Sequence, residues 1–577
     1  MLTPTPSDSH LPVHRVADFA TVAEAIDHAA LGRTGANFYS GKGELTEALP
    51  YSLLREQAID LARRMLASGL GKGDRVAMIA ETEGDFLRAF AACQYAGLVP
   101  APMPLPAAFG GKDAYIAHIR RMIEGAAASA ALAPASLLEW LRAAADGLPL
   151  KAVGTVAAFD GVDGSGVSLP TVGPDDLCYL QFSSGSTRFP KGVAVTQRSL
   201  MANAFAIARH GLRIGPADRC MSWLPLYHDM GLVGFLLTPL VTQLSVDYLP
   251  TREFARRPLM WLNLITRNKA TLSFSPTFGY ELCARRAETA STEGIDLSSW
   301  RAAGIGGDMI RPGVMARFAE AFGVRGFDKG ALLPSYGMAE ASLALSFAPP
   351  GAGVVTDRVD MDRLENEQVA EAPGPGAARV RDFVLCGPVL PGHGLEVRDP
   401  QGRALPERRV GKVHVRGPSL MREYFNMPDE TAEVLSPDGW LDTGDLGYLT
   451  GGQIVITGRA KDLILVNGRN IWPQDLEWSS ENGVDALRSG DVAAFSVDAE
   501  GGESVVVLVQ CRPTDPAVRE GLRTQVSGLL RAAHGLDVEV VLVPPHSLPQ
   551  TSSGKLSRSR AKQMYLRGDF APATAAG

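Results

Sequence analysis

The strongest local signal in this chain is the stretch FSSGSTRFPKGV, residues Phe182–Val193. It follows the apolar run Leu177–Phe182, which predicts a buried strand. Gly185 lets the backbone turn tightly, and successive backbone N–H groups in such a turn form a nest that binds anions. The loop adds hydroxyl groups and one positive charge, from Ser183, Ser184, Ser186, Thr187 and Lys191. The stretch therefore predicts a strand followed by a phosphate-binding loop, with an ordinary Ser/Gly-rich turn as the alternative.

Strand-like and helix-like segments alternate around this stretch. Arg75–Ala80 has the pattern of a buried strand, Asp85–Tyr95 that of a helix, and Val99–Pro102 that of another extended segment. Ala126–Ala135 is interpreted as a packed helix of small residues. Later strand-like runs are Lys412–Arg416, Ile454–Thr457 and Val505–Gln510. The alternation predicts an α/β fold with largely parallel sheets.

With 577 residues, the chain is longer than one ordinary domain. A strand-like run ends in GRAKD at Gly458–Asp462, where we expect a domain junction. This predicts a large N-terminal domain of several subdomains over residues 1–460 and a small, mobile α+β domain over residues 461–577. Pro349–Asp382 is charged, then rich in Pro and Gly, and has neither helical nor strand period. We expect a surface insertion there.

Composition excludes several classes of protein. The net charge of −7 argues against nucleic acid as the main partner. The six cysteines form no CxxC pair, so zinc and redox motifs are absent, and scattered thiols suit a reducing cytosol. The polar N-terminus lacks the apolar core of a signal peptide. The longest apolar run, Gly231–Val241, is too short to span a bilayer, so we expect a cytoplasmic protein without a transmembrane segment.

Two further segments carry candidate site residues. Trp223–Gly234, WLPLYHDMGLVG, places His228 between apolar runs, either as a packed structural residue or as a gate between two pockets. Ser335–Glu340 reads SYGMAE. Tyr336 can stack on a base, and the carboxylate of Glu340 is an oxygen ligand of the kind that Mg²⁺ prefers. The alternative is a turn that carries a surface glutamate.

Two more segments complete the set. Leu441–Leu446, LDTGDL, offers Asp445 in a turn. Its carboxylate can accept hydrogen bonds from both hydroxyls of a ribose, although turn aspartates usually just cap the backbone. Pro549–Arg558, PQTSSGKLSR, places Lys555 in a Ser/Gly-rich loop. Such a lysine either reaches an active site as a mobile cation or belongs to a solvated tail.

In order and spacing, these segments resemble the adenylate-forming superfamily of acyl-CoA synthetases, peptide-synthetase adenylation domains and luciferases. The resemblance runs from about Phe19 to about Tyr565, nearly the whole chain. Within that superfamily the sequence looks most like the fatty acyl-AMP ligases. This closer likeness rests on the insertion after SYGMAE and on the segments LQFSSGSTRFPKGV, LPLYHDMGLVG, SYGMAEASLALSF and NGRNIWPQDLE.

The resemblance implies a role for each candidate. His228 lies beside the acyl carboxylate, Lys555 bridges that carboxylate and the α-phosphate, Glu340 binds Mg²⁺, and Lys461 is the hinge of the C-terminal domain. The implied ATP- and AMP-binding set is Ser183, Ser184, Gly185, Ser186, Thr187 and Lys191 at the phosphates, Gly306, Gly307, Asp308, Ser335, Tyr336, Gly337 and Met338 around the adenine, and Asp445 and Arg459 at the ribose. One departure affects this set, because GIGGDM at Gly304–Met309 has Asp where close relatives often have Glu.

The implied activity is ATP- and Mg²⁺-dependent conversion of a fatty acid to an acyl-adenylate, with release of pyrophosphate. The acyl group then passes to the phosphopantetheine thiol of an acyl carrier protein. An acyl-CoA synthetase would share the fold and the first step but use free CoA; the segment Pro349–Asp382 favours the ligase, although a flexible loop would look the same. A third reading is a non-catalytic acyl- or nucleotide-binding relative, against which the joint presence of Lys191, Glu340, Asp445 and Lys555 argues.

Overall fold

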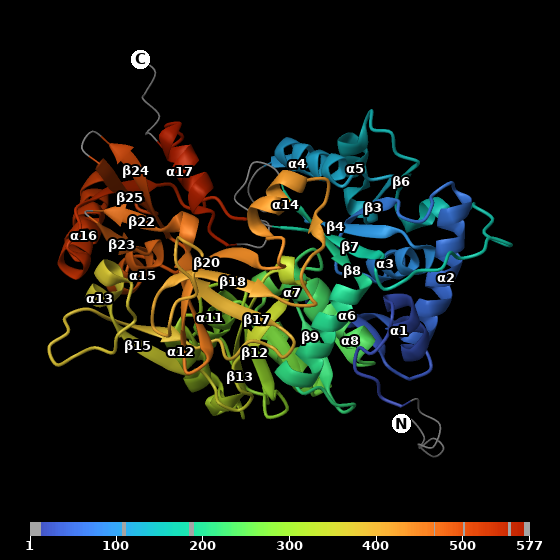
Figure 1. The fold of residues 1–577 in the computed structure, drawn as a ribbon, viewed down its shortest axis with the longest axis horizontal. Helices are drawn as coiled ribbons and strands as arrows, with labels where there is room; N and C mark the ends of the chain where they lie inside the picture. Colours follow the sequence, from blue (N-terminus) through green and yellow to red (C-terminus); the bar gives the residue numbers. More distant parts are fainter. Residues whose placement is uncertain are drawn as a thin grey trace.

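The computed structural model describes residues 13–106, 111–183, 190–466, 468–499, 502–551 and 555–570. Its largest sheet orders the strands β14-β13-β12-β11-β9-β10-β1-β2, and Figure 1 shows it in the N-terminal part. The inner strands run parallel, while β14 and β2 pair antiparallel at the two edges. The bounds are β1 Gly35–Tyr39, β2 Leu45–Pro50, β9 Arg219–Ser222, β10 Ser245–Tyr248, β11 Leu272–Ser275, β12 Ala302–Ile305, β13 Leu332–Gly337 and β14 Ala344–Phe347.

A second sheet, β4-β3-β5-β6, is parallel throughout, so the predicted α/β class with parallel-rich sheets is confirmed. Its elements are β3 Arg75–Ile79, α3 Gly84–Ala96, β4 Val99–Met103, β5 Ala130–Leu132 and β6 Ala152–Gly154. The predicted helix at Ala126–Ala135 is wrong, because its centre is strand β5, which is buried along its whole length. Tertiary context here overrides the high helix propensity of alanine.

Helices cover the sheets with their apolar faces. The spacing of Ile116, Ile119, Met122 and Ile123 predicts one apolar helical face; in α4 the last three are buried and Ile116 is half-buried. The principal helices of the N-terminal part are α1 Val22–Ala29, α2 Tyr51–Ala67, α4 Gly111–Gly125, α5 Leu138–Ala145, α6 Gln197–Ala206, α7 Asp229–Leu232, α8 Thr238–Val241, α9 Thr251–Arg256, α10 Leu259–Asn268, α11 Thr277–Ala287, α12 Pro312–Gly323 and α14 Pro428–Val434. None of the helices in the described ranges is both long and apolar enough to cross a membrane.

Smaller antiparallel sheets follow the parallel ones. Sheet β19-β8-β7 carries the start of the predicted phosphate loop, and sheet β17-β18-β20-β21 leads toward the C-terminal part. Their strands are β7 Leu177–Phe182, β8 Gly192–Thr196, β17 Gly394–Arg398, β18 Gly411–Arg416, β19 Glu423–Tyr424, β20 Leu441–Thr450 and β21 Gln453–Arg459.

The segment predicted as an irregular surface insertion has regular structure and is partly buried. Its elements are β15 Thr356–Asp360, α13 Met361–Glu367 and β16 Val380–Val384. Strands β15 and β16 pair antiparallel, and Val359 and Leu364 are buried in one hydrophobic cluster with Trp472. The expectation of no regular elements is therefore wrong, because these elements are too short to show a period in the sequence. The side chain of Asp360 caps α13 by accepting from the backbone N–H groups of the first turn.

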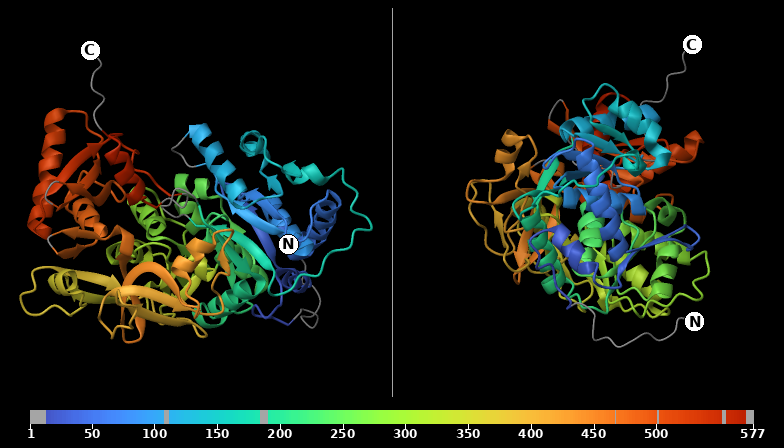
Figure 2. Two further views of the ribbon diagram at one scale, coloured as in Figure 1. Left: turned by 45° about the horizontal axis from the view of Figure 1, so that its top comes forward. Right: turned by 90° about the vertical axis from the view of Figure 1, so that its right-hand side faces the viewer.

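The C-terminal part, residues 464–570, has an apolar core of its own. Strand β25 is its centre, antiparallel to β24 and parallel to β26, and α15 and α16 pack on this sheet. The elements are β22 Ile464–Val466, β23 Arg469–Ile471, α15 Pro473–Gly483, β24 Val492–Ala499, β25 Gly502–Gln510, α16 Pro516–His534, β26 Val538–Val543 and α17 Arg558–Leu566. Figures 1 and 2 show this part, in orange and red, at one end of the molecule beside α13 and β15.

Candidate active site

Two adjoining cavities of about 200 and 270 Å³ lie where the strand ends of the N-terminal part meet the C-terminal part. Residues that line both are Gly307, Ser335, Tyr336, Gly337, Asp445, Arg459, Lys461 and Lys555. Segments that are far apart in the sequence, and were singled out there separately, therefore converge on one site.

The described part of the predicted phosphate loop borders the larger cavity. The backbone N–H of Ser183 donates to the carbonyl oxygen of Lys191 over 3.0 Å, which joins the two ends of the loop. The Lys191 ammonium lies 4.5 Å from the centre of the Tyr424 ring, a cation–π contact beside the cavity. The predicted loop residues Ser184, Gly185, Ser186 and Thr187 lie outside the described residues.

The carboxyl ends of β12 and β13 form one wall, because these neighbouring strands are parallel. Gly306 has no room for a side chain, since a Cβ atom there would lie 2.7 Å from the Ser335 hydroxyl oxygen. Gly307 has a φ of +76°, in the left-handed region that favours glycine. Asp308 follows and is exposed, and its carboxylate accepts from the backbone N–H of Met309. The backbone at GGDM is thus open toward the cavity.

Tyr336, Asp445 and Arg459 form a connected group. The Tyr336 hydroxyl donates to Asp445 Oδ2 over 2.8 Å, and Arg459 Nε lies 3.5 Å from Asp445 Oδ1. The register of β20 and β21 places Asp445 directly opposite Arg459. Burial raises the pKa of Asp445, while the positive charge of Arg459 opposes that shift. A buried carboxylate with fixed neighbours therefore faces the cavity.

Glu340 and Met338 extend this wall into the larger cavity. Glu340 lies in the short helix η6, Ala339–Ala341, and its Oε1 accepts from the Tyr424 hydroxyl over 2.8 Å. Burial raises the pKa of Glu340. The backbone N–H of Met338 donates to the carbonyl oxygen of Leu343, and a Cβ atom on Gly337 would collide with that same oxygen. The tight turn therefore requires glycine and presents Glu340 to the cavity.

His228 lies at the N-cap of α7 and lines the larger cavity with the next residue, Asp229. Its Nδ1 is 2.7 Å from Asp229 Oδ1. Burial raises the pKa of Asp229, but interactions with His228, Lys555 and the backbone N–H of Met230 outweigh this effect, so the net pKa is lowered. Asp229 was missed by sequence reasoning; the adjacent letters HD in YHDMG are the signal that could have identified it.

Lys555 extends into the site from the C-terminal part. Its Nζ lies 3.9 Å from the point that a Cβ atom of Gly307 would occupy, and it lines both cavities. The backbone N–H of Thr551 donates to the carbonyl oxygen of Lys555, and the backbone N–H of Lys555 donates to the Thr551 hydroxyl. Lys461, in the short helix η7 over Ala460–Asp462, lines both cavities as well, and burial lowers its pKa.

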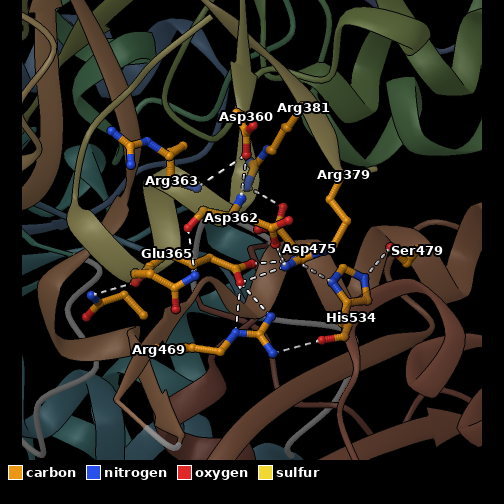
Figure 3. A network of polar contacts seen from close by, with 12 residues as sticks. Asp360, Asp362, Arg363, Glu365, Arg379, Arg381, Arg469, Asp475, Ser479 and His534 are labelled. Carbon is orange, nitrogen blue, oxygen red and sulfur yellow. Dashed lines mark hydrogen bonds and ion pairs between the residues drawn. The ribbon is translucent and has the colours of Figure 1, made fainter. Parts of the chain in front are cut away.

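A buried charge network ties the segment β15–α13–β16 to the C-terminal part (Figure 3). Its centre is Glu365 on α13, which is fully buried. Arg379 Nη1 donates to this carboxylate over 2.8 Å, and Arg469 Nη2, on β23, donates over 2.6 Å. The Asn470 side chain donates to the backbone carbonyl oxygen of Glu365. One carboxylate thus joins arginines from both sides of the interface.

A second set of contacts flanks this network. Arg381, on β16, pairs with Asp475 at the start of α15, and burial raises the pKa of Asp475 to about 6. His534, at the end of α16, lies between Arg379 and Ser479. Because an arginine can only donate, His534 Nδ1 accepts and its Nε2–H donates to the Ser479 hydroxyl, which is the neutral form of the ring. The contacts Arg381–Asp475 and Arg379–His534 also cross the interface, whereas His534–Ser479 lies within the C-terminal part.

An α/β chain with these strand-end carboxylates, and with a lysine that enters from a C-terminal part, has the architecture of an adenylate-forming ligase. The chain matches the model of the AMP-binding enzyme family over residues 24–425. It belongs to that family and is an adenylate-forming ligase.

Three similar proteins indicate which members of the family this chain resembles. A protein of Caulobacter vibrioides (strain NA1000 / CB15N), with the provisional name acyl-CoA synthetase, is 56% identical over 570 residues, 99% of both chains. The medium-chain-fatty-acid–[acyl-carrier-protein] ligase JamA of Moorena producens (strain JHB) is 31% identical over 96% of both chains. A structure from a study of fatty acyl-adenylate ligases of E. coli and L. pneumophila has a TM-score of 0.92 and 45% identity, covering 97% of this chain and all of the other. The resemblance to fatty acyl-AMP ligases is thereby confirmed.

Proposed function

We propose that this enzyme activates a fatty acid with ATP, forms the acyl-adenylate and releases pyrophosphate, and then passes the acyl group to the phosphopantetheine thiol of an acyl carrier protein. The observation that carries the first half is the convergence of Lys191, Glu340, Asp445 and Lys555 on two adjoining cavities. These side chains supply the cations and carboxylates that a nucleoside triphosphate requires.

In this proposal the nucleotide spans both cavities. Asp445 accepts hydrogen bonds from the ribose hydroxyls with Arg459 beside it, and the open backbone at Gly306–Asp308 borders the adenine together with Tyr336. The Tyr336 hydroxyl already donates to Asp445, so the ring and the carboxylate are held as one unit. Ser183 and Lys191 begin and end the loop that would cover the phosphates.

The residues present fit Mg²⁺. This cation usually binds one or two protein carboxylates together with substrate phosphates, and it keeps several waters. Glu340 is a cavity-lining carboxylate that a hydroxyl donor, Tyr424, holds in place. Within the described residues no group of three or more metal-ligating side chains exists, which agrees with a metal that depends on the nucleotide for its other ligands. When bound, Mg²⁺ would neutralise phosphate charge.

The adenylation step is an in-line attack of the acid's carboxylate on the α-phosphate, with pyrophosphate as the leaving group. Lys555 neutralises the negative charge that develops where the acid's carboxylate attacks the α-phosphate, and His228 lies beside that carboxylate. Positioning and charge compensation supply most of the rate, because the protein forms no bond itself. The position of Lys555 in the cavity suits this step, and the remainder of residues 461–577 would turn about Lys461 to admit the thiol.

The acceptor distinguishes the two candidate functions. In this proposal the Glu365 network holds the C-terminal part in the arrangement that presents Lys555. A ligand changes that arrangement only if it binds the other arrangement more tightly. A carrier protein can gain this binding energy over a whole docking surface, whereas CoA gains it only from its own few contacts. The name of the Moorena relative supports a carrier protein. The name of the Caulobacter relative favours the alternative, an acyl-CoA synthetase.

The test is ATP–pyrophosphate exchange across fatty acids of increasing length, followed by addition of CoA or of a phosphopantetheine-loaded carrier protein. We expect exchange with fatty acids, acyl transfer to the carrier and little acyl-CoA. Rapid acyl-CoA formation would establish the acyl-CoA synthetase instead, and absence of exchange with every acid would contradict both.

A further inference from the structure

The pair His228 and Asp229 has a geometry that adenylation does not explain. Nδ1 of the ring and Oδ1 of the carboxylate lie 2.7 Å apart, and the two side chains are 17% and 13% exposed. A contact of this length requires a proton between the two atoms. The Asp229 carboxylate is held in its ionised form by its neighbours, so the ring nitrogen is the donor.

The helix cap near the pair does not need the lone pair of His228 Nδ1 as its acceptor. The backbone N–H of Met230 is 2.8 Å from Asp229 Oδ1 but 3.4 Å from His228 Nδ1, so its better acceptor is the carboxylate. Nδ1 therefore carries a hydrogen, and Nε2 is the ring atom left for the cavity that His228 lines. In the neutral ring Nε2 has a free lone pair, which is the form of histidine that accepts a proton.

Charged groups surround the pair from several other elements. Asp229 interacts electrostatically with Lys555 from the C-terminal part and with Glu340 from η6. The other charged groups that line the same cavity are Lys191, Asp445, Arg459 and Lys461. When Lys555 withdraws for the transfer step, Asp229 loses the positive charge of that lysine and keeps its contact with His228. A proton on His228 is then compensated by Asp229.

We propose that His228, oriented by Asp229, is the general base of the thiol-transfer step. Nε2 takes the proton from the S–H group of the acceptor as the sulfur attacks the acyl carbonyl carbon. The C–S bond forms, the C–O bond to the phosphate of AMP breaks, and AMP leaves as an anion. The proton stays on His228, and Asp229 stabilises the imidazolium. His228 is the catalytic residue of this step, and Asp229 is its positioning residue.

This inference rests on the proposed thiol acceptor, and its test uses enzyme loaded with stoichiometric acyl-adenylate, so that only transfer is measured. The acceptor is a phosphopantetheine-loaded carrier protein, with CoA in parallel. For His228→Ala we expect transfer at pH 7 to fall by about 10²- to 10⁴-fold, the usual contribution of a general base. The rate of transfer by His228→Ala should rise about tenfold per pH unit up to the pKa of the thiol itself, about 8.5, because without the base only the thiolate form of the acceptor reacts.

Two further measurements separate a base from a residue that only positions the acyl group. Free imidazoles should restore transfer by His228→Ala, and more basic imidazoles should restore it better, as a Brønsted relation requires. Asp229→Asn keeps the size of the side chain but removes its charge, and should lower transfer less than His228→Ala does. His210→Gln, at an exposed histidine, is the matched control and should leave the rate unchanged.

If the loss of transfer rate in His228→Ala depends neither on pH nor on the basicity of the added imidazole, the base assignment is wrong. Near wild-type transfer by either His228→Ala or Asp229→Asn would also overturn it. If His228→Ala does not fold, the pH profile of Asp229→Asn decides. If the wild-type enzyme transfers the acyl group to CoA but not to the carrier protein, only the proposed acceptor is contradicted. The same variants then test the general base with CoA as acceptor.

Discussion

Replacing Glu365 with glutamine tests whether the buried network controls the orientation of the C-terminal part. The carboxylate is fully buried, and it is shared by Arg379 and Arg469, which are 19% and 23% exposed. Breaking a buried pair by removing one partner costs about 3–5 kcal/mol. Because both arginines keep some contact with water, we take the lower figure, about 3 kcal/mol, which corresponds to about a hundredfold change in an equilibrium.

If that free energy holds the adenylating arrangement, Glu365→Gln should raise the ratio of acyl-CoA to acyl-AMP by up to about a hundredfold. Mass spectrometry of the products with CoA as sole acceptor measures this ratio. Glu367→Gln is the matched control on the same helix, since Glu367 pairs with Arg363 at the surface, where such a pair contributes less than about 1 kcal/mol. A lower melting temperature with an unchanged product ratio would refute the reasoning and leave the network a purely structural role.

A point substitution is preferable to deleting the segment. Trimming residues 357–378 to a short Gly/Ser link would remove the buried side chains of Val359 and Leu364 from their cluster with Trp472. It would also remove Asp357, which accepts from Tyr448 and pairs with Arg408. Loss of folding would then obscure any effect on product choice.

The other predictions concern the two cavities of the candidate site and the acid stability of the interface. Lys555→Ala should slow ATP–pyrophosphate exchange at least about 10²-fold, because a charge contact made in the transition state is lost; exchange near the wild-type rate would exclude the assignment. Glu340→Ala should weaken the dependence of turnover on Mg²⁺ and Asp445→Ala should weaken ATP binding, with thermal melts to separate misfolding; unchanged titrations in both would contradict the nucleotide site. Lys461→Pro should abolish transfer while adenylation largely persists, because proline restricts φ at the hinge; equal loss of both activities would point to a hinge elsewhere. Burial, together with nearby arginines, lowers the pKa of His534 to about 4. The unfolded chain, with a histidine pKa near 6.5, therefore binds the proton first, and stability falls by up to about 3 kcal/mol as pH drops from about 6.5 to about 4. Between about pH 6.5 and pH 4 the melting temperature of His534→Gln should fall less than that of the wild type. If the two melting temperatures fall in parallel, His534 is not the group that lowers the acid stability.

Part of the candidate site could be predicted from sequence because its segments carry local signals. The strand at Leu177–Phe182 was predicted with the bounds that β7 has, since a run of apolar residues before a glycine turn reports burial and chain reversal directly. A Cβ atom would meet the backbone carbonyl oxygen of Leu343 at Gly337 and the hydroxyl oxygen of Ser335 at Gly306, so the identity of both glycines is tied to local geometry. The role of Asp229, by contrast, is not evident from the sequence, because it depends on the 2.7 Å contact between its carboxylate and the ring of His228.

The α/β class and the short motifs that border the cavities can be predicted from the sequence alone. These follow from burial periodicity and turn chemistry, which act between residues close together in the chain. The entry of Lys555 into the cavity beside Gly307 and the link that Glu365 makes between Arg379 and Arg469 become visible in the folded chain alone. A buried charge is stable only with a partner, and chain packing supplies that partner from a distant segment, about which local sequence patterns carry no information.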